Sequence, residues 1–345
     1  NNIINEGPIR QEWNLVGNPY PSYLRVRDFL EHDLGGVTNI QLFDASTAAI
    51  YGYDGNANNG WTVYNLANIT VSTLIAPGQG FFVSADAANV ETYDLEFTPA
   101  MRSTGNGDDF IQGRNAELTY LKLSASTANK TYVTDFYVNN NASLGFDVGY
   151  DAALWGDTPP DFAIYSHLVE DNDGRAITLQ SINHTDITDV SIPLGVHANQ
   201  GEQVTLSIAE MNLPDSVNVY LEDVVANTVN LLNNSDYILS PTTALSGTGR
   251  FFLRMAEDAL STIDNNLDVL NIFTLHSSKE LIVSGQLQEN TQLDLYDIQG
   301  RKVLSAALDT TLIENRINTA SISTGVYVVK LQNNEQQKSQ KVIIK

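Results

Sequence analysis

Cysteine is absent from this chain of 345 residues. Disulfide frameworks, zinc sites with thiolate ligands and thiol nucleophiles are therefore excluded. Long apolar runs are absent too, because no stretch approaches the roughly 18 consecutive apolar residues of a membrane-spanning helix. The sequence accordingly predicts no transmembrane segment.

Positive charge is scarce, with 18 Lys and Arg against 41 Asp and Glu and a net charge of −23. Nucleic acid and anionic membrane surfaces are therefore not expected partners.

The charge is also distributed unevenly along the chain. Residues 262–345 carry 8 basic and 9 acidic side chains, whereas the preceding residues carry 10 basic and 32 acidic ones. This shift predicts a domain boundary near residues 255–265.

Catalytic motifs are missing as well. The sequence has no Gly-x-Ser-x-Gly nucleophile elbow, and no glycine pair extends into a dinucleotide or phosphate loop. The five histidines are scattered and form no His-x-His or His-Glu-x-x-His pair. We therefore expect that this chain is not an enzyme and that it needs no cofactor.

The C-terminal stretch shows the clearest pattern of short strands. Leu293 and Leu295 alternate with Asp294 and Tyr296, which is the two-residue period of a strand. Residues 297–300 suit a tight turn in which the glycine supplies a positive φ. Residues 326–331 are rich in β-branched and aromatic side chains, and lysines bound the final strand at 341–345. About seven strands in this stretch predict a small Ig-like antiparallel sandwich.

Three blocks of this stretch also carry a resemblance. Leu295–Val303 (Leu-Tyr-Asp-Ile-Gln-Gly-Arg-Lys-Val), Thr324–Leu331 (Thr-Gly-Val-Tyr-Val-Val-Lys-Leu) and the lysine-bounded last strand resemble the type A C-terminal sorting domain of Bacteroidota. Proteins with this domain are exported by the type IX secretion system. The resemblance covers about a quarter of the chain and implies a folded export signal.

The resemblance implies partners and recognition residues. The partners are the outer-membrane translocon, its shuttle β-barrel and a cell-surface sortase that commonly removes the domain. The edge of the last strand is a further candidate for pairing with a partner strand. The residues expected to be recognised are Tyr296, Asp297, Gly300, Arg301, Lys302, Gly325, Tyr327, Lys341 and Lys345.

The upstream residues predict an all-β chain of antiparallel β-sandwich domains in tandem. Residues 1–104 are expected to form a β-rich domain with one short helix at 23–32, and strands that include 37–43 and 92–98. Residues 105–258 predict a larger, jelly-roll-like sandwich, because strand candidates recur every 8–14 residues or so. Residues 259–266 are expected to be a linker and residues 267–345 the sorting domain.

Several surface features are candidate ligand sites. Asp54, Asn56 and Asn58 offer oxygen ligands at alternate positions, as in a calcium loop, and residues 170–174 form a second acidic turn. Both also read as ordinary surface turns. Trp61 and Trp155 are candidates for binding sugar faces, or else fill a core. Ser216 and Thr310 follow aspartates in a pattern that resembles a Bacteroidota O-glycosylation site.

Taken with the resemblance, these features predict a secreted or cell-surface protein whose upstream domains are structural or adhesive. The alternative is a carbohydrate-binding accessory region of a secreted enzyme whose catalytic domain lies upstream of residue 1. The chain starts at Asn1 rather than Met and enters a strand almost at once. We therefore expect it to be a fragment or processed product of a longer secreted precursor.

Overall fold

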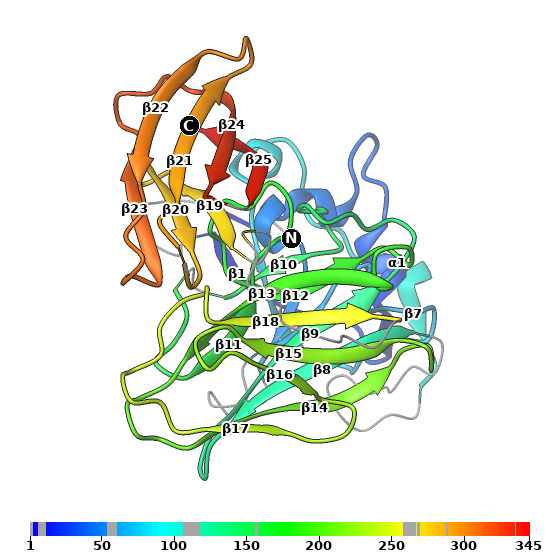
Figure 1. The fold of residues 1–345 in the computed structure, drawn as a ribbon. Coiled ribbons are helices and arrows are strands. Elements are labelled where there is room, and N and C mark those ends of the chain that lie inside the picture. Colours follow the sequence, from blue (N-terminus) through cyan, green and yellow to red (C-terminus); the bar gives the residue numbers. More distant parts are fainter. Residues whose placement is uncertain are drawn as a thin grey trace.

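The structure is a computed structural model. It describes residues 3–5, 12–53, 61–105, 118–155, 158–257, 267, 270–287, 289–334 and 336–345. Strands hold 45% of the chain and helices 7%, which confirms the all-β prediction. Figure 1 shows a body (residues 3–257), coloured blue to yellow, with a C-terminal module (residues 267–345), orange to red, packed against it.

The first part of the body holds two small antiparallel sheets. One has the order β1-β6-β3-β4 and the other β5-β2-β7. Their strands are β1 (Trp13–Gly17), β2 (Tyr23–Arg25), β3 (Ile50–Gly52), β4 (Thr62–Tyr64), β5 (Leu74–Ile75), β6 (Gly80–Ser84) and β7 (Arg102–Ser103). The helices here are the short α1 (Val26–Leu30) and α2 (Ala87–Val90), with 3-10 turns η1 (Asn39–Leu42), η2 (Ala45–Thr47) and η3 (Pro99–Met101).

Three local predictions in this part were wrong. The predicted helix at 23–32 is shorter, because Tyr23–Arg25 pairs as a strand with β5 and β7. Residues 37–43 contain η1 instead of a strand, and residues 92–98 form none. For residues 37–43 and 92–98 the cause is Asn39. Its buried amide donates to the carbonyls of Phe29 and Glu96 at 2.8 Å each and accepts from the Glu96 N–H at 3.1 Å. These distant partners override the local alternation.

The second part of the body is one sheet of eleven strands that curls toward a barrel. Its order is β16-β15-β18-β13-β11-β12-β9-β8-β14-β17, with β10 paired to β12. All its described pairs are antiparallel except β9 with β12. The strands are β8 (Thr119–Ser126), β9 (Thr131–Val138), β10 (Ala152–Ala153), β11 (Ala163–Ser166), β12 (Ile177–Ile182), β13 (Asp189–His197), β14 (Val204–Asn212), β15 (Asn218–Asp223), β16 (Thr228–Leu231), β17 (Tyr237–Leu239) and β18 (Phe251–Ala256). The enclosed core is built from alternate residues of these strands, such as Leu121, Leu123 and Phe136.

The C-terminal module is a sandwich of two antiparallel sheets. One has the order β19-β20-β23 and the other β22-β21-β24-β25. The strands are β19 (Asn271–Leu275), β20 (Glu280–Ser284), β21 (Gln292–Asp297), β22 (Lys302–Ala307), β23 (Glu314–Asn318), β24 (Gly325–Gln332) and β25 (Gln337–Ile344). Leu281, Leu295 and Val329, all fully buried, lie in the core between the sheets. The strands predicted from alternation in this stretch are thereby confirmed.

The two parts of the body have separate cores and share a third, smaller one. Tyr51 of β3 and Leu179 of β12 lie in one buried cluster, and the Tyr51 hydroxyl donates to the Ala153 carbonyl at 2.9 Å. The Leu66 N–H also donates to the Gly149 carbonyl at 2.8 Å. The predicted boundary near residue 104 is therefore crossed by close contacts.

A buried ion pair joins neighbouring strands of the large sheet. Asp223, fully buried, accepts from Arg250 Nε at 3.0 Å and Nη2 at 2.7 Å, and from the Tyr237 hydroxyl at 2.8 Å. Arg254, four residues further on and within β18, pairs instead with Asp189, whose side chain is 76% exposed. Both arginines thus pair with an aspartate, one buried and one exposed.

We expect Arg250→Met to lower the free energy of unfolding by about 3 kcal/mol, because it leaves the Asp223 carboxylate buried without its cation. Arg254→Met is the comparison and should cost less, because its hydrogen-bond partner Asp189 stays hydrated, although the buried Glu222 also loses a nearby cation. Equilibrium urea denaturation measures both. Equal losses for the two variants would contradict this account.

Candidate functional site

The turn between β21 and β22 is held by one aspartate. Asp297 accepts hydrogen bonds from the N–H groups of Arg301 and Gln299, both at 2.9 Å, and from Arg301 Nε at 2.7 Å. These bonds hold the pKa of Asp297 below its usual value, and the bond from the Arg301 N–H has the largest effect. Gly300 has a φ of +78°, as the sequence predicted for this turn. The turn is therefore rigid although it lies on the surface.

A hollow of about 660 Å³ lies where this turn meets the segment that leads into β24. Ile298 and Arg301 border it from the turn. Ile298 is 76% exposed, and so is the side chain of Arg301. Residues 321–327 border it from the other side, where the Tyr327 hydroxyl donates to the Ser323 carbonyl at 2.7 Å. Two sequence blocks that are far apart in the chain therefore form one concave surface.

The outer face of the four-stranded sheet continues this surface. Tyr296, Val328 and Lys341 are cross-strand partners on β21, β24 and β25. Val326 and Val328 are 43% and 39% exposed, so the face mixes apolar and basic groups. The hydrogen bond from the Ser305 hydroxyl, and then Lys302 at 3.3 Å, lower the pKa of Asp294.

The structure separates the predicted recognition residues into three groups. Asp297, Gly300, Arg301 and Gly325 lie at the hollow or its turn, and Tyr296, Lys302 and Lys341 lie on or beside the outer sheet face. Tyr327 is 8% exposed and packs in the module core beneath the hollow that it borders, while Lys345 follows the end of β25. Sequence reasoning missed Ile298, Val303, Val326 and Val328, whose exposed apolar side chains only the structure reveals.

The edge of β25 is not open as the sequence analysis expected. β19 lies along it, and the Thr274 hydroxyl donates to the Ile343 carbonyl at 2.9 Å. A side chain of β25 also contacts the backbone of β19, since Gln340 Nε2 donates to the Ile272 carbonyl at 3.0 Å. Strand pairing with a partner at this edge would first have to displace β19.

Trp61 and Trp155 are brought together although they lie far apart in sequence. Their rings stack with centroids 4.7 Å apart, and Trp13, Tyr53 and Phe82 surround them. Both tryptophans are half-buried, whereas Tyr53 is 46% exposed. Each tryptophan therefore has part of its ring covered by the other, and the cluster joins the two parts of the body.

The remaining candidate sites are placed as follows. The calcium loop at Asp54, Asn56 and Asn58 lies outside the described residues. Within the described residues no group of three or more His, Asp or Glu side chains could hold a metal. In the second acidic turn Asp173 pairs with Arg175 and Asp171 pairs with Lys341. Ser216 is exposed and donates to Glu257 at 3.1 Å, and Thr310 is half-buried.

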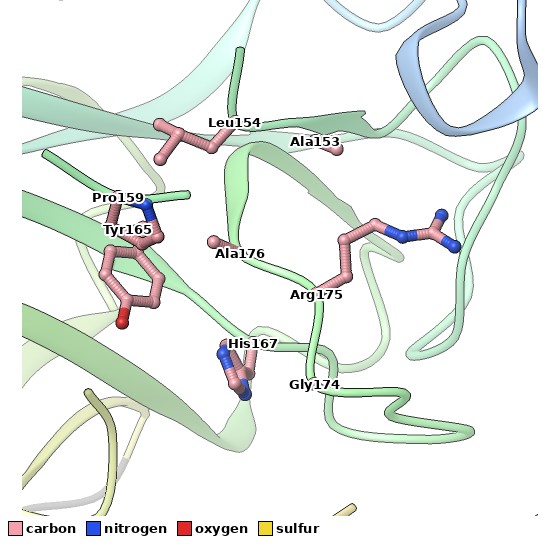
Figure 2. A pocket seen from close by; sticks show the side chains of 8 residues that line it. All are labelled: Ala153, Leu154, Pro159, Tyr165, His167, Gly174, Arg175 and Ala176. Carbon is pink, nitrogen blue, oxygen red and sulfur yellow. The ribbon is translucent and has the colours of Figure 1, made fainter. Parts of the chain in front are cut away.

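A smaller cavity of about 180 Å³ lies in the body. Figure 2 shows Leu154, Tyr165 and His167 around it, while the Arg175 side chain extends away from them. Pockets for small organic ligands usually hold about 300–1,000 Å³. This cavity lies below that range.

Comparison with protein families assigns both parts of the chain. The model of a domain of unknown function, DUF8693, matches residues 4–255, well over half of the chain. The chain belongs to the DUF8693 family. A second model, for the secretion system C-terminal sorting domain, matches residues 271–345. The body is thus the DUF8693 domain, and the C-terminal module is a sorting domain, as the resemblance predicted.

The sorting domain makes the protein a substrate of the type IX secretion system. It indicates export to the cell surface or the extracellular space. No helix in the described ranges is long and apolar enough to cross a membrane. No curated protein matches the chain.

Gly300→Ala should destabilise the sorting domain by about 1 kcal/mol, because a Cβ is strained at positive φ. Gly325→Ala is the control, since Gly325 has no positive φ and its added Cβ would meet the Tyr327 ring at an ordinary 3.4 Å. We expect that control to stay within about 0.5 kcal/mol of the parent chain. Equilibrium denaturation of the full chain distinguishes the two, and equal effects would argue against a strained turn.

Proposed function

We propose that the sorting domain is read by the outer-membrane translocon and its shuttle β-barrel through the hollow at Ile298 and the adjoining sheet face. The supporting observation is that two of the three sequence blocks of the resemblance, Leu295–Val303 and Thr324–Leu331, meet at this hollow. Ile298 is 76% exposed on a turn that Asp297 holds rigid, and exposed apolar groups on rigid turns suit a binding surface. The sheet face adds the basic side chains of Lys302 and Lys341.

The DUF8693 domain is the cargo in this proposal, with a structural or adhesive role and no catalytic one. Among its described residues, strongly shifted titratable groups such as Tyr132 lie inside the fold, and Tyr165 and His167 border only the small cavity of Figure 2. Burial raises the pKa of Tyr132 to about 12, and burial also raises the pKa of Asp135. A catalytic group has to reach its substrate, so these shifts favour a structural origin.

An export assay tests the recognition surface. The full chain, preceded by a secretory signal peptide, is expressed in a Bacteroidota host with and without the translocon, and the protein outside the cells is quantified. Ile298→Asp should reduce export about tenfold or more, because a hydrated carboxylate replaces the apolar group at the hollow.

Val71→Asp is the matched control, since Val71 is also 76% exposed but lies in the DUF8693 domain. It should be exported like the parent chain. Melting curves of the purified proteins establish that both variants are folded. Normal export of a folded Ile298→Asp protein would remove the hollow from the recognition surface.

The aromatic cluster favours a second candidate function, binding of a carbohydrate. Trp61 is half-buried and Tyr53 beside it is 46% exposed, with ring centroids 5.3 Å apart. Aromatic faces of this kind can stack on sugar rings. A sugar would lie on the Tyr53 side, because Trp155 already covers part of Trp61.

If the cluster binds glycans, an array probed with the full chain should show specific binding that Tyr53→Ala lowers about tenfold. Tyr53 is chosen because its loss removes little buried contact. Val71→Ala should leave binding unchanged. An array without any specific binding would leave the structural or adhesive role as the better explanation.

A further inference from the structure

The two domains meet through buried polar side chains that no sequence motif indicated. Asn271, the first residue of β19, is 5% exposed and accepts a hydrogen bond from Asn172 Nδ2 at 2.9 Å. Its own Nδ2 donates to Thr248 Oγ1 at 3.2 Å and lies 3.5 Å from His167 Nδ1. All three partners belong to the DUF8693 domain, so Asn271 is committed to contacts across the domain boundary.

Strands β19 and β20 of the sorting domain are buried on both faces. Ile272 and Leu281 point into the sandwich core, as alternation requires. Phe273 and its cross-strand partner Ile282 are not part of that core, yet they are only 5% and 0% exposed. The DUF8693 domain covers this second face, with the His167 ring edge-on to the Phe273 ring at 5.1 Å. Without that cover the sorting domain would present an apolar patch to water.

Two glycines of the DUF8693 domain allow this close approach. A Cβ on Gly249 would lie 2.1 Å from Ser284 Oγ and 2.8 Å from the Gly285 nitrogen. A Cβ on Gly174 would lie 2.7 Å from Leu275 and 2.8 Å from Phe273. The Ser284 hydroxyl also donates to the Thr248 carbonyl at 2.8 Å. The surfaces therefore fit as tightly as packed side chains within a domain.

The interface also has a buried centre and a charged rim. Burial lowers the pKa of His167 to about 3, so the imidazole is neutral at the centre. At the rim, Lys341 lies 2.8 Å from Asp171, and the hydrogen bond to this carboxylate raises the pKa of Lys341. The cavity of Figure 2 borders the same region, since His167 and Gly174 line it. Specific protein interfaces share this arrangement of a desolvated centre and a hydrated polar rim.

We propose that residues 167–174 and 248–249 of the DUF8693 domain form a receptor for β19 and β20 of the sorting domain. This receptor holds the sorting domain in place without the covalent connection. Cleavage of the chain between the domains would therefore not by itself release the sorting domain. Separation would need dilution, competition for the Phe273 face or a force applied to the sorting domain. This inference does not depend on which surface the export machinery reads.

The test uses the full chain with a specific protease site inserted within residues 258–266. After complete cleavage the two fragments should co-elute in size-exclusion chromatography at about 1 µM, a concentration at which a specific interface is occupied. Fragments that separate at this concentration, while circular dichroism shows both to be folded, would overturn the proposal.

Point variants identify the interface. Asn271→Ala should weaken the association of the cut fragments at least about tenfold, because it leaves Asn172 and Thr248 without their partner. Thr248→Val makes a parallel test from the other side and leaves the sorting domain unchanged in sequence. Lys302→Ala is the control, since its ion pair with Asp294 lies within the sorting domain, and it should not alter association. Unchanged association in both Asn271→Ala and Thr248→Val would also overturn the proposal.

Discussion

Burial of both faces of β19 and β20 is the constraint on which the arrangement of this protein depends. One face, with Ile272 and Leu281, completes the core of the sorting domain. The other, with Phe273 and Ile282, is covered by the DUF8693 domain. A small sandwich normally hides one face of each sheet and leaves the other to water. Here the second face is also apolar, so the two domains complete each other.

This constraint decides which surfaces remain available. Because β19 and β20 face the DUF8693 domain and β19 lies along the edge of β25, the accessible features lie on the other sheet. They are the rigid turn at Asp297, the hollow beside Ile298 and the face that carries Val328. A folded export signal has to be recognised while it is attached to its cargo, and these features are accessible in that state.

The DUF8693 domain shows how strongly distant contacts shape an all-β chain. Its two parts have separate main cores, but Tyr51 and Leu179 share a third one, and the stacked Trp61 and Trp155 lie over the same junction. The single family match across residues 4–255 spans both parts. The aromatic side chains thus serve mainly to hold the two parts together. A sugar would have to bind the exposed surface of Tyr53.

The sequence by itself determined the features that are encoded locally. Alternation at Leu293–Tyr296 located β21 (Gln292–Asp297), and the glycine in residues 297–300 indicated the turn with positive φ. These features depend on neighbouring residues, whose side chains and backbone angles a short stretch of sequence already fixes. The motifs of the sorting domain are local in the same sense, which is why the type IX assignment was accessible.

Only the tertiary structure decided which distant residues meet. Residues 37–43 alternate like a strand but contain a 3-10 turn, because Asn39 bonds to Phe29 and Glu96. The parallel pair of β9 with β12, the stacking of Trp61 on Trp155 and the cluster around Asn271 are likewise set by chain reversals far from the residues concerned. Sequence periodicity shows that a side chain such as Phe273 is to be buried, but the partner that buries it is chosen by the packing of whole domains.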